Sequence, residues 1–214
     1  MIGDKILVTP AHRQAAVALT KYLGFTKHRP IHKLALSICG ESGSGKSEMA
    51  IAFRDELVKL EIPSVIFQQD DYFKYPPFTN AKKREMDINQ VGPQEVDLNR
   101  LDNDIAKFKT GAKIIEKPLV HYDENRFSTE QLIVKEAVVA IVEGTYTCQL
   151  HSLDYRVFIN RTYTETRKHR LKRAREEQND FLEQILLIEH QIIRRYKTRA
   201  NFVIEKDFSV RSQP

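Results

Sequence analysis

The chain has 214 residues, 41% of them hydrophobic and 29% charged, which suits one globular domain over residues 1–214. Its formal net charge of +5 admits anionic partners such as nucleotides. Two cysteines, Cys39 and Cys148, are too few for a secreted disulfide framework or a four-cysteine zinc site. No apolar run approaches the roughly 18 to 20 residues of a membrane span, and the N-terminus lacks an export pattern, so we expect a cytoplasmic protein without membrane contact.

The first 33 residues predict a helical extension. A helix over residues 11–23 follows Thr9, which is a favoured N-cap residue, and Pro10, which suits the first helical position. Gly24 comes after its end, where helices commonly terminate in a left-handed conformation. The sequence assigns no role to this extension.

Short apolar runs rich in β-branched residues recur along the rest of the chain and predict buried strands. They cover residues 34–39, 64–67, 138–142, 155–159 and 202–204. Segments with helical spacing lie between them, over residues 48–60, 98–108, 164–177 and 181–196. Strands that alternate with helices predict an α/β fold with a parallel sheet covered on both faces.

Residues 74–96 form the longest stretch without a clear period, and we expect a loop there. A loop of this length inside a compact domain is often functional. Its basic residues Lys82, Lys83 and Arg84 would suit an anionic substrate.

Residues 40–47, GESGSGKS, satisfy the pattern G-x-x-x-x-G-K-[ST] between a predicted strand and a predicted helix. Glycines let successive N–H groups curl around phosphate oxygens, and the following helix adds the positive end of its dipole. We expect Lys46 to reach the β- and γ-phosphates and the Ser47 hydroxyl to ligate Mg²⁺. The alternative is a turn that binds nothing. The predicted nucleotide site comprises Gly40, Glu41, Ser42, Gly43, Ser44, Gly45, Lys46 and Ser47.

A buried run at residues 138–142 ends in Glu143. Mg²⁺ prefers hard oxygen ligands, and a strand beside a phosphate loop can deliver a carboxylate to the metal's water shell. We therefore predict Glu143 as the second metal-site residue, against the alternative of a carboxylate that merely ends a strand.

Asp70 and Asp71 follow the second predicted strand, at the edge where open parallel sheets place their ligands. One of them could accept the proton of an attacking hydroxyl and orient it towards the γ-phosphorus. A solvated turn explains the pair equally well, and the residues alone do not separate the two carboxylates.

The segment 167–175, RKHRLKRAR, places Arg167, Arg170 and Arg173 on one helical face. Arginines that close over a transferring phosphoryl group would stabilise its charge and exclude water. A solvated helix face and a nucleic-acid surface are the alternatives. Beside a phosphate loop, we favour the closing lid.

Together, GESGSGKS, QDDYF, VGPQEVD, EGTY and the arginine-rich segment resemble the uridine kinase and phosphoribulokinase family of P-loop kinases, over about residues 34–208. The resemblance implies a three-layer α/β/α sandwich around a five-stranded parallel core, with a helical lid over about residues 164–180. It also implies an enzyme that uses ATP and Mg²⁺ to phosphorylate a hydroxyl of a small molecule.

Carried over residue by residue, the resemblance assigns the role of base to Asp70 and places Phe73 of the same motif in the substrate site. It places Glu143 of EGTY near Mg²⁺. Arg170 and Arg173 match the family's lid pair.

Residues 118–126, PLVHYDENR, are similar to the family's P-x-Y…H-x-R segment, with Asn125 where the His would fall. Tyr122 could stack on a base, and Arg126 could hold an anion or a carbonyl. The family's D-H-P motif contacts ribose, and here residues 91–93 read V-G-P, so the charged acceptor for a ribose hydroxyl is missing. The phosphate acceptor therefore stays open.

Our leading hypothesis is a kinase of a nucleoside-like or sugar-like metabolite, with phosphoribulokinase-like and pantothenate kinase-like acceptors as alternatives. A GTPase-type switch or nucleotide-dependent binding module is a rival, although residues 160–163 do not satisfy the guanine-reading motif N-K-x-D. We expect no nucleic-acid partner, and a homo-oligomer stays possible.

Overall fold

The computed structural model describes residues 6–27, 32–167, 170–171 and 179–213, and its centre is a six-stranded sheet in the order β2-β5-β1-β6-β7-β8. The strands are β1 (Leu34–Gly40), β2 (Ser64–Gln68), β5 (Val139–Glu143), β6 (Tyr155–Ile159), β7 (Phe202–Ile204) and β8 (Val210–Ser212). Every pairing is parallel except that of β8 with β7. The predicted parallel core is confirmed, and the antiparallel edge strand β8 is an addition to it.

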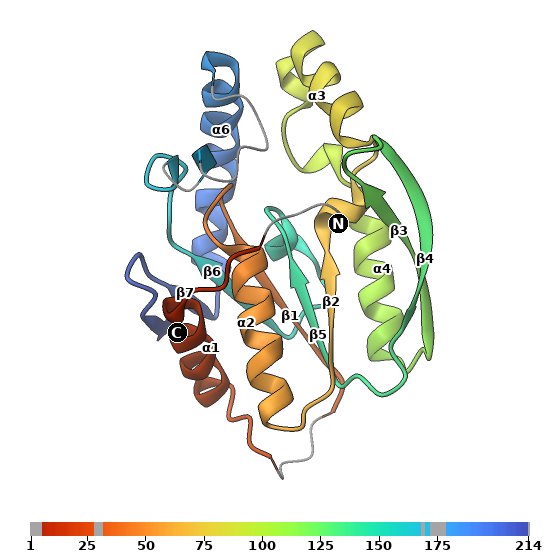
Figure 1. Cartoon of the computed structure of the whole chain (residues 1–214), viewed down its shortest axis with the longest axis vertical. Helices are drawn as coiled ribbons and strands as arrows, with labels where there is room; N and C mark the ends of the chain where they lie inside the picture. Colours follow the sequence, from red (N-terminus) through yellow and green to blue (C-terminus); the bar gives the residue numbers. More distant parts are fainter. Residues whose placement is uncertain (1–5, 28–31, 168–169, 172–178, 214) are drawn as a thin grey trace.

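Two layers cover the sheet (Figure 1). One contains α1 (Pro10–Tyr22) and α2 (Lys46–Lys59), and the other contains α4 (Leu98–Lys109) and a hairpin of β3 (Ile114–His121) and β4 (Arg126–Ile133). In β1, Leu36 and Ile38 pack with the first layer, whereas Ala35 and Cys39 pack with the second. Because neighbouring residues of a strand point to opposite faces, the apolar run is buried on both sides. The three-layer α/β/α prediction is confirmed.

The carboxyl ends of the parallel strands carry two further helices. In Figure 1, α3 (Pro77–Met86) and α6 (Asp180–Ile193) rise above this edge of the sheet on opposite sides. The helix predicted over residues 181–196 thus ends at Ile193 and continues as the 3₁₀ segment Arg194–Arg199. In the described part of the chain, no helix is long and apolar enough to cross a bilayer.

The prediction of a loop over residues 74–96 was wrong for its first half, which forms α3. Pro77 occupies the first turn, where its fixed φ favours a helix. The Asn125 side chain, from the β3–β4 turn, accepts hydrogen bonds from the N–H groups of Phe78 (2.9 Å) and Thr79 (3.4 Å). Only Asn80 of α3 is buried, so the sequence of this helix shows no apolar period. The N–H groups at its start are hydrogen-bonded by Asn125, which is remote in sequence, so no local capping pattern marks the helix either.

The N-terminal helix was predicted correctly, with Thr9 as N-cap and Gly24, at φ 67°, just after its end. The two cysteines are too few for a disulfide framework, yet they pair with each other. Cys39 and Cys148 form a disulfide that joins the end of β1 to the turn after β5. Their 109-residue separation gives no local signal of pairing, and only the parallel register of β1 and β5 brings them together.

Candidate active site

The phosphate loop, residues 40–47, joins β1 to α2, as predicted. Gly43 and Gly45 have φ angles of 72° and 101°, a region that glycine adopts without steric cost. A Cβ on Gly43 would lie 2.8 Å from the Cγ atom of Arg170, and one on Gly45 would lie 2.9 Å from the Nε2 atom of His12. Both positions therefore require glycine for packing as well as for backbone conformation. His12 of the N-terminal helix thus supports the loop.

Glu41 fixes the loop to its surroundings. Its carboxylate is buried, accepts a hydrogen bond from the N–H of Tyr163 (2.7 Å), and lies 2.7 Å from the Nδ1 atom of His190 on α6. The Lys46 ammonium donates to the Glu41 carbonyl at 3.1 Å. Sequence reasoning missed His190, since a lone histidine on an amphipathic helix carries no signal of such a partner.

Glu143 and Ser47 form a polar corner at the start of α2. The Ser47 hydroxyl donates to the Glu143 carboxylate at 3.1 Å, and the Gln68 amide approaches the same oxygen at 3.4 Å. Burial, and after it the charge of Asp70, raises the pKa of Glu143 to about 7, although Lys46 and both hydrogen bonds oppose the shift.

The donor chemistry of this corner fits Mg²⁺, which prefers hard oxygen ligands and keeps several waters. In the described residues, no group of three or more His, Cys, Asp or Glu side chains could hold a metal ion alone. The corner thus matches a cation held jointly by Ser47, Glu143, water and phosphate oxygens.

The two neighbouring aspartates have different environments. Asp71 is buried, and its carboxylate accepts hydrogen bonds from the Lys117 ammonium (2.6 Å) and the N–H of Val120 (3.0 Å). Asp70 instead lines a cavity of about 440 Å³ that also contains Lys46 and Glu143. Asp71 therefore ties the β3–β4 hairpin to the sheet, and Asp70 is the carboxylate open to a ligand.

The same cavity extends between α3, the hairpin and α6. Phe73 and Tyr122 line it, and the Tyr122 ring meets Phe78 of α3 edge to face at 5.7 Å. Arg126 is not among the lining residues: its Nε group donates to Glu124 at 2.6 Å, and its side chain is half exposed. The structure thus brings together all the predicted substrate residues except Arg126.

The predicted lid is only partly within the described residues. Arg170 is buried beside Gly43, donates to the carbonyl of Tyr163 and to the Thr166 hydroxyl, and pairs with Glu183 at 3.2 Å. It backs the phosphate loop and does not line the cavity. Arg173, like most of the predicted helix over residues 164–177, lies outside the described residues.

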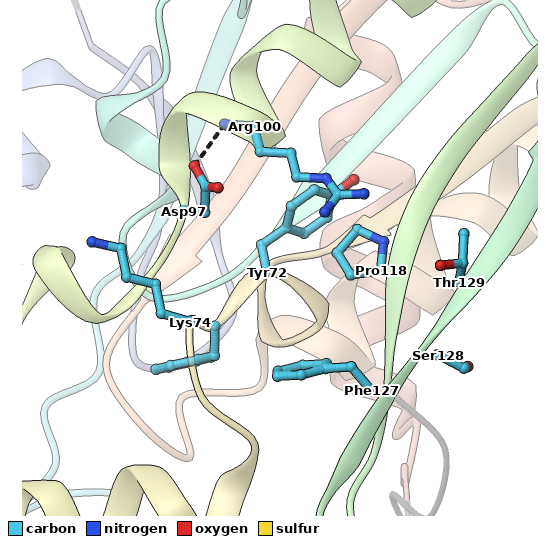
Figure 2. Close-up of a pocket in the computed structure, with 9 residues that line it drawn as sticks. Tyr72, Lys74, Asp97, Arg100, Pro118, Phe127, Ser128 and Thr129 are labelled. Atoms are coloured by element: carbon cyan, nitrogen blue, oxygen red, sulfur yellow. Dashed lines mark hydrogen bonds between the residues drawn. The ribbon is translucent and has the colours of Figure 1, made fainter.

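A second cavity, of about 460 Å³, is lined by hairpin residues such as Pro118 and Phe127 (Figure 2). Phe73 lines both cavities. Asp97 is the carboxylate in its lining, and its side chain accepts the N–H of Arg100 as the N-cap of α4. No residue of the phosphate loop reaches this cavity. We therefore place the chemistry in the first cavity.

A glycine-rich loop at a helix N-terminus, on the carboxyl edge of a parallel sheet, together with carboxylates from two adjacent strands, defines a P-loop nucleotide-binding protein. The family model of the Phosphoribulokinase / Uridine kinase family matches residues 35–205. The chain belongs to this family of P-loop kinases, which phosphorylate hydroxyl groups of small molecules.

Two curated relatives are similar over most of this chain. A bifunctional alpha-galactosidase/sucrose kinase of Mediterraneibacter gnavus is 25% identical over 196 residues, which are 85% of this chain and 21% of that protein. A pantothenate kinase of Shewanella amazonensis is 28% identical over 159 residues, which are 73% of this chain and 49% of that protein. The chain thus spans about a fifth of the length of the first relative and about half of the length of the second.

Solved structures share the fold. A possible uridine kinase from Bacillus stearothermophilus matches with a TM-score of 0.65 at 17% identity, covering 89% of this chain and 97% of that one. Phosphoribulokinase from Rhodobacter spheroides matches with a TM-score of 0.61 at 10% identity, covering 81% and 70%.

Proposed function

We propose that the protein is an ATP- and Mg²⁺-dependent kinase that transfers the γ-phosphate to a hydroxyl of a sugar-like or nucleoside-like metabolite. The observation that carries this proposal is that Asp70, Glu143 and Lys46 line one cavity together with residues of the phosphate loop. The sucrose kinase among the relatives favours a sugar hydroxyl, and the uridine kinase fold is compatible with a nucleoside.

The loop N–H groups and Lys46 bind the triphosphate. Ser47 and Glu143 would hold Mg²⁺, which neutralises phosphate charge when bound. Lys46 now donates to the Glu41 carbonyl, and exchanging that neutral partner for phosphate oxygens gives charge-assisted hydrogen bonds.

Asp70 accepts the proton of the acceptor hydroxyl and orients its oxygen towards the γ-phosphorus. Phe73 and Tyr122 form the apolar wall against which the acceptor lies. Arg126, if it contacts an acceptor, must first leave Glu124.

From the match to the family's lid pair, we also propose that Arg170 and Arg173 stabilise the charge of the transferring group as part of a lid over about residues 164–180. To do so, Arg170 must first leave the carbonyl of Tyr163 and the carboxylate of Glu183. We further propose that residues 1–214 form one kinase domain, whose extension, residues 1–33, supports the phosphate loop through His12.

We also propose a cytoplasmic location, as expected from the sequence. In the reducing cytoplasm, either the buried Cys39–Cys148 disulfide resists cellular reductants or the fold stays intact after its reduction.

Asp70→Asn tests the proposal, with Asp123→Asn in the exposed hairpin turn as its control. Loss of a general base typically costs about 10²- to 10⁴-fold in rate. We expect Asp70→Asn to lose turnover by this factor, measured as ADP release with a sugar and nucleoside panel, while ATP affinity measured by calorimetry stays near that of Asp123→Asn. Full turnover by Asp70→Asn would remove this residue from the role.

A further inference from the structure

The acceptor end of the cavity has a definite charge. The term acceptor pocket is used here for one part of the first cavity. It is lined by Asn80, Arg84 and Glu85 of α3, Tyr122 of the hairpin, and Phe181 and Glu189 of α6. Its identification as the acceptor site rests on the proposed function.

The cation in this pocket, Arg84, is neutralised by protein carboxylates. Its guanidinium donates to both oxygens of Glu95, at 2.5 and 2.9 Å, and Nη2 also approaches Glu189 at 3.4 Å. Glu95 is held in turn by the Asn80 amide and by the N–H of Gly92, both at 2.8 Å. Burial alone would lower the pKa of Arg84, but the hydrogen bonds and charges of Glu95 and Glu189 raise it, so this side chain stays charged and paired.

Among the described residues, three further lysines do not line this cavity. Lys83 lies over the ring of Tyr75, with Nζ 4.2 Å from its centroid, and Lys117 is buried against Asp71. Lys82 is exposed and is not among the lining residues. Lys82 and Lys83 thus stay outside the lining of the cavity, and Arg84, which belongs to it, is paired with carboxylates.

The whole cavity, as far as the described residues line it, carries more negative than positive charge. Its ionisable side chains are Lys46, Arg84, Asp70, Glu85, Glu143 and Glu189. Lys46 belongs to the phosphate loop, so the acceptor meets Arg84 with its partner Glu189, and Asp70 and Glu85 besides. An acceptor phosphate or carboxylate would lose its hydration and face like charges, which disfavours binding.

Uncharged hydroxyl groups find good partners here. The carboxylates of Glu85 and Glu189 can accept O–H hydrogen bonds, and the Nη1 group of Arg84 has no hydrogen bond to another described residue, so it can donate one. Tyr122 and Phe181 add flat apolar surface. We infer that the phosphate acceptor is an uncharged polyhydroxylated molecule, and not a sugar phosphate or a carboxylate.

Matched pairs of compounds test this inference by calorimetry, with the protein saturated with Mg²⁺ and a non-hydrolysable ATP analogue. The pairs are fructose and fructose 6-phosphate, ribulose and ribulose 5-phosphate, pantothenol and pantothenate, and uridine and uridine monophosphate. We expect a neutral member to bind, and its charged partner to bind about tenfold more weakly or worse. The pair that responds distinguishes a sugar from a nucleoside.

A charged member that binds more tightly than its neutral partner would overturn the inference, and so would an analogue-loaded protein that binds no neutral member. Failure of the analogue itself to bind is a different result, which refutes the proposed function at the phosphate loop.

Glu189→Gln gives the second arm, because it removes one charge beside Arg84 at nearly constant volume. We expect it to shift selectivity towards the charged member of the responding pair by about tenfold. Asp180→Asn removes a charge from the same helix outside the cavity and is expected to leave selectivity unchanged. Equal selectivity shifts in both variants would show that overall charge, and not the acceptor pocket, decides.

Discussion

Glu143→Gln should stabilise the metal-free protein increasingly as the pH rises above about 4.5, with the full effect reached above about pH 7. Burial and the charge of Asp70 raise the pKa of Glu143 from 4.5 to about 7 in the folded chain. The folded state therefore holds this proton more tightly than the unfolded state. The resulting stability is complete below the unfolded pKa of 4.5 and is lost as the pH rises through about 7.

The magnitude follows from the shift. The change in pKa from 4.5 to about 7, at about 1.36 kcal/mol for each tenfold change in proton affinity, gives a cost on the order of 3 kcal/mol for ionised Glu143 above neutral pH. Glutamine resembles the protonated acid, so Glu143→Gln should change the free energy of unfolding little at about pH 4 and raise it by up to about 3 kcal/mol at about pH 8.5.

Urea unfolding at both pH values, without Mg²⁺, measures the difference, in which the titrating groups that do not interact with Glu143 cancel. Glu136→Gln, at an exposed carboxylate before β5, is the control and should show no such pH dependence. An equal effect of Glu143→Gln at both pH values, or destabilisation at about pH 8.5, would refute the reasoning. The same variant should lose turnover at saturating ATP, since it removes the carboxylate proposed at the metal.

Two further variants probe the loop and the disulfide. Gly43→Ala should abolish ATP binding in calorimetry, because its Cβ would lie 2.8 Å from the Cγ atom of Arg170. Gly111 also has a positive φ but open space around it, so Gly111→Ala is the control and should bind ATP normally. Equal ATP affinities of the two variants would show that the loop tolerates a side chain. Reductant should lower the free energy of unfolding by about 4 to 5 kcal/mol, because the disulfide closes a loop of 109 residues in the unfolded chain. A variant with both Cys39 and Cys148 changed to Ala should show no effect of reductant. If the stability of the wild type is unchanged by reductant, the disulfide does not contribute to it.

The sequence predicted what local patterns encode. The strand, glycine-rich loop and helix around Lys46 follow one another within a short stretch, and each has its own signal. Apolar runs buried on both faces likewise marked the parallel strands. The residues next to them in sequence could not distinguish the roles of Asp70 and Asp71. The difference arises because Asp71 is bound by Lys117 and Val120, which lie on the distant hairpin.

The parts that were missed depend on distant partners or break a pattern. Pro118 argues against a strand, yet it is tolerated in β3 because β3 pairs with β4 alone and leaves its other edge free of ladder hydrogen bonds. Arg84 looked like a free cation for an anionic substrate, whereas Glu189, which lies 105 residues away on α6, helps neutralise it. Such pairs become visible only once the fold has assembled them.

Titration of the wild-type protein with ATP and Mg²⁺ in a calorimeter tests the central claim most directly, with Lys46→Met as the comparison. The account predicts that the wild type binds one molecule of ATP and that Lys46→Met binds it far more weakly, because the ammonium beside the phosphate loop is gone. No heat with the wild type, or equal affinity in both proteins, would contradict it.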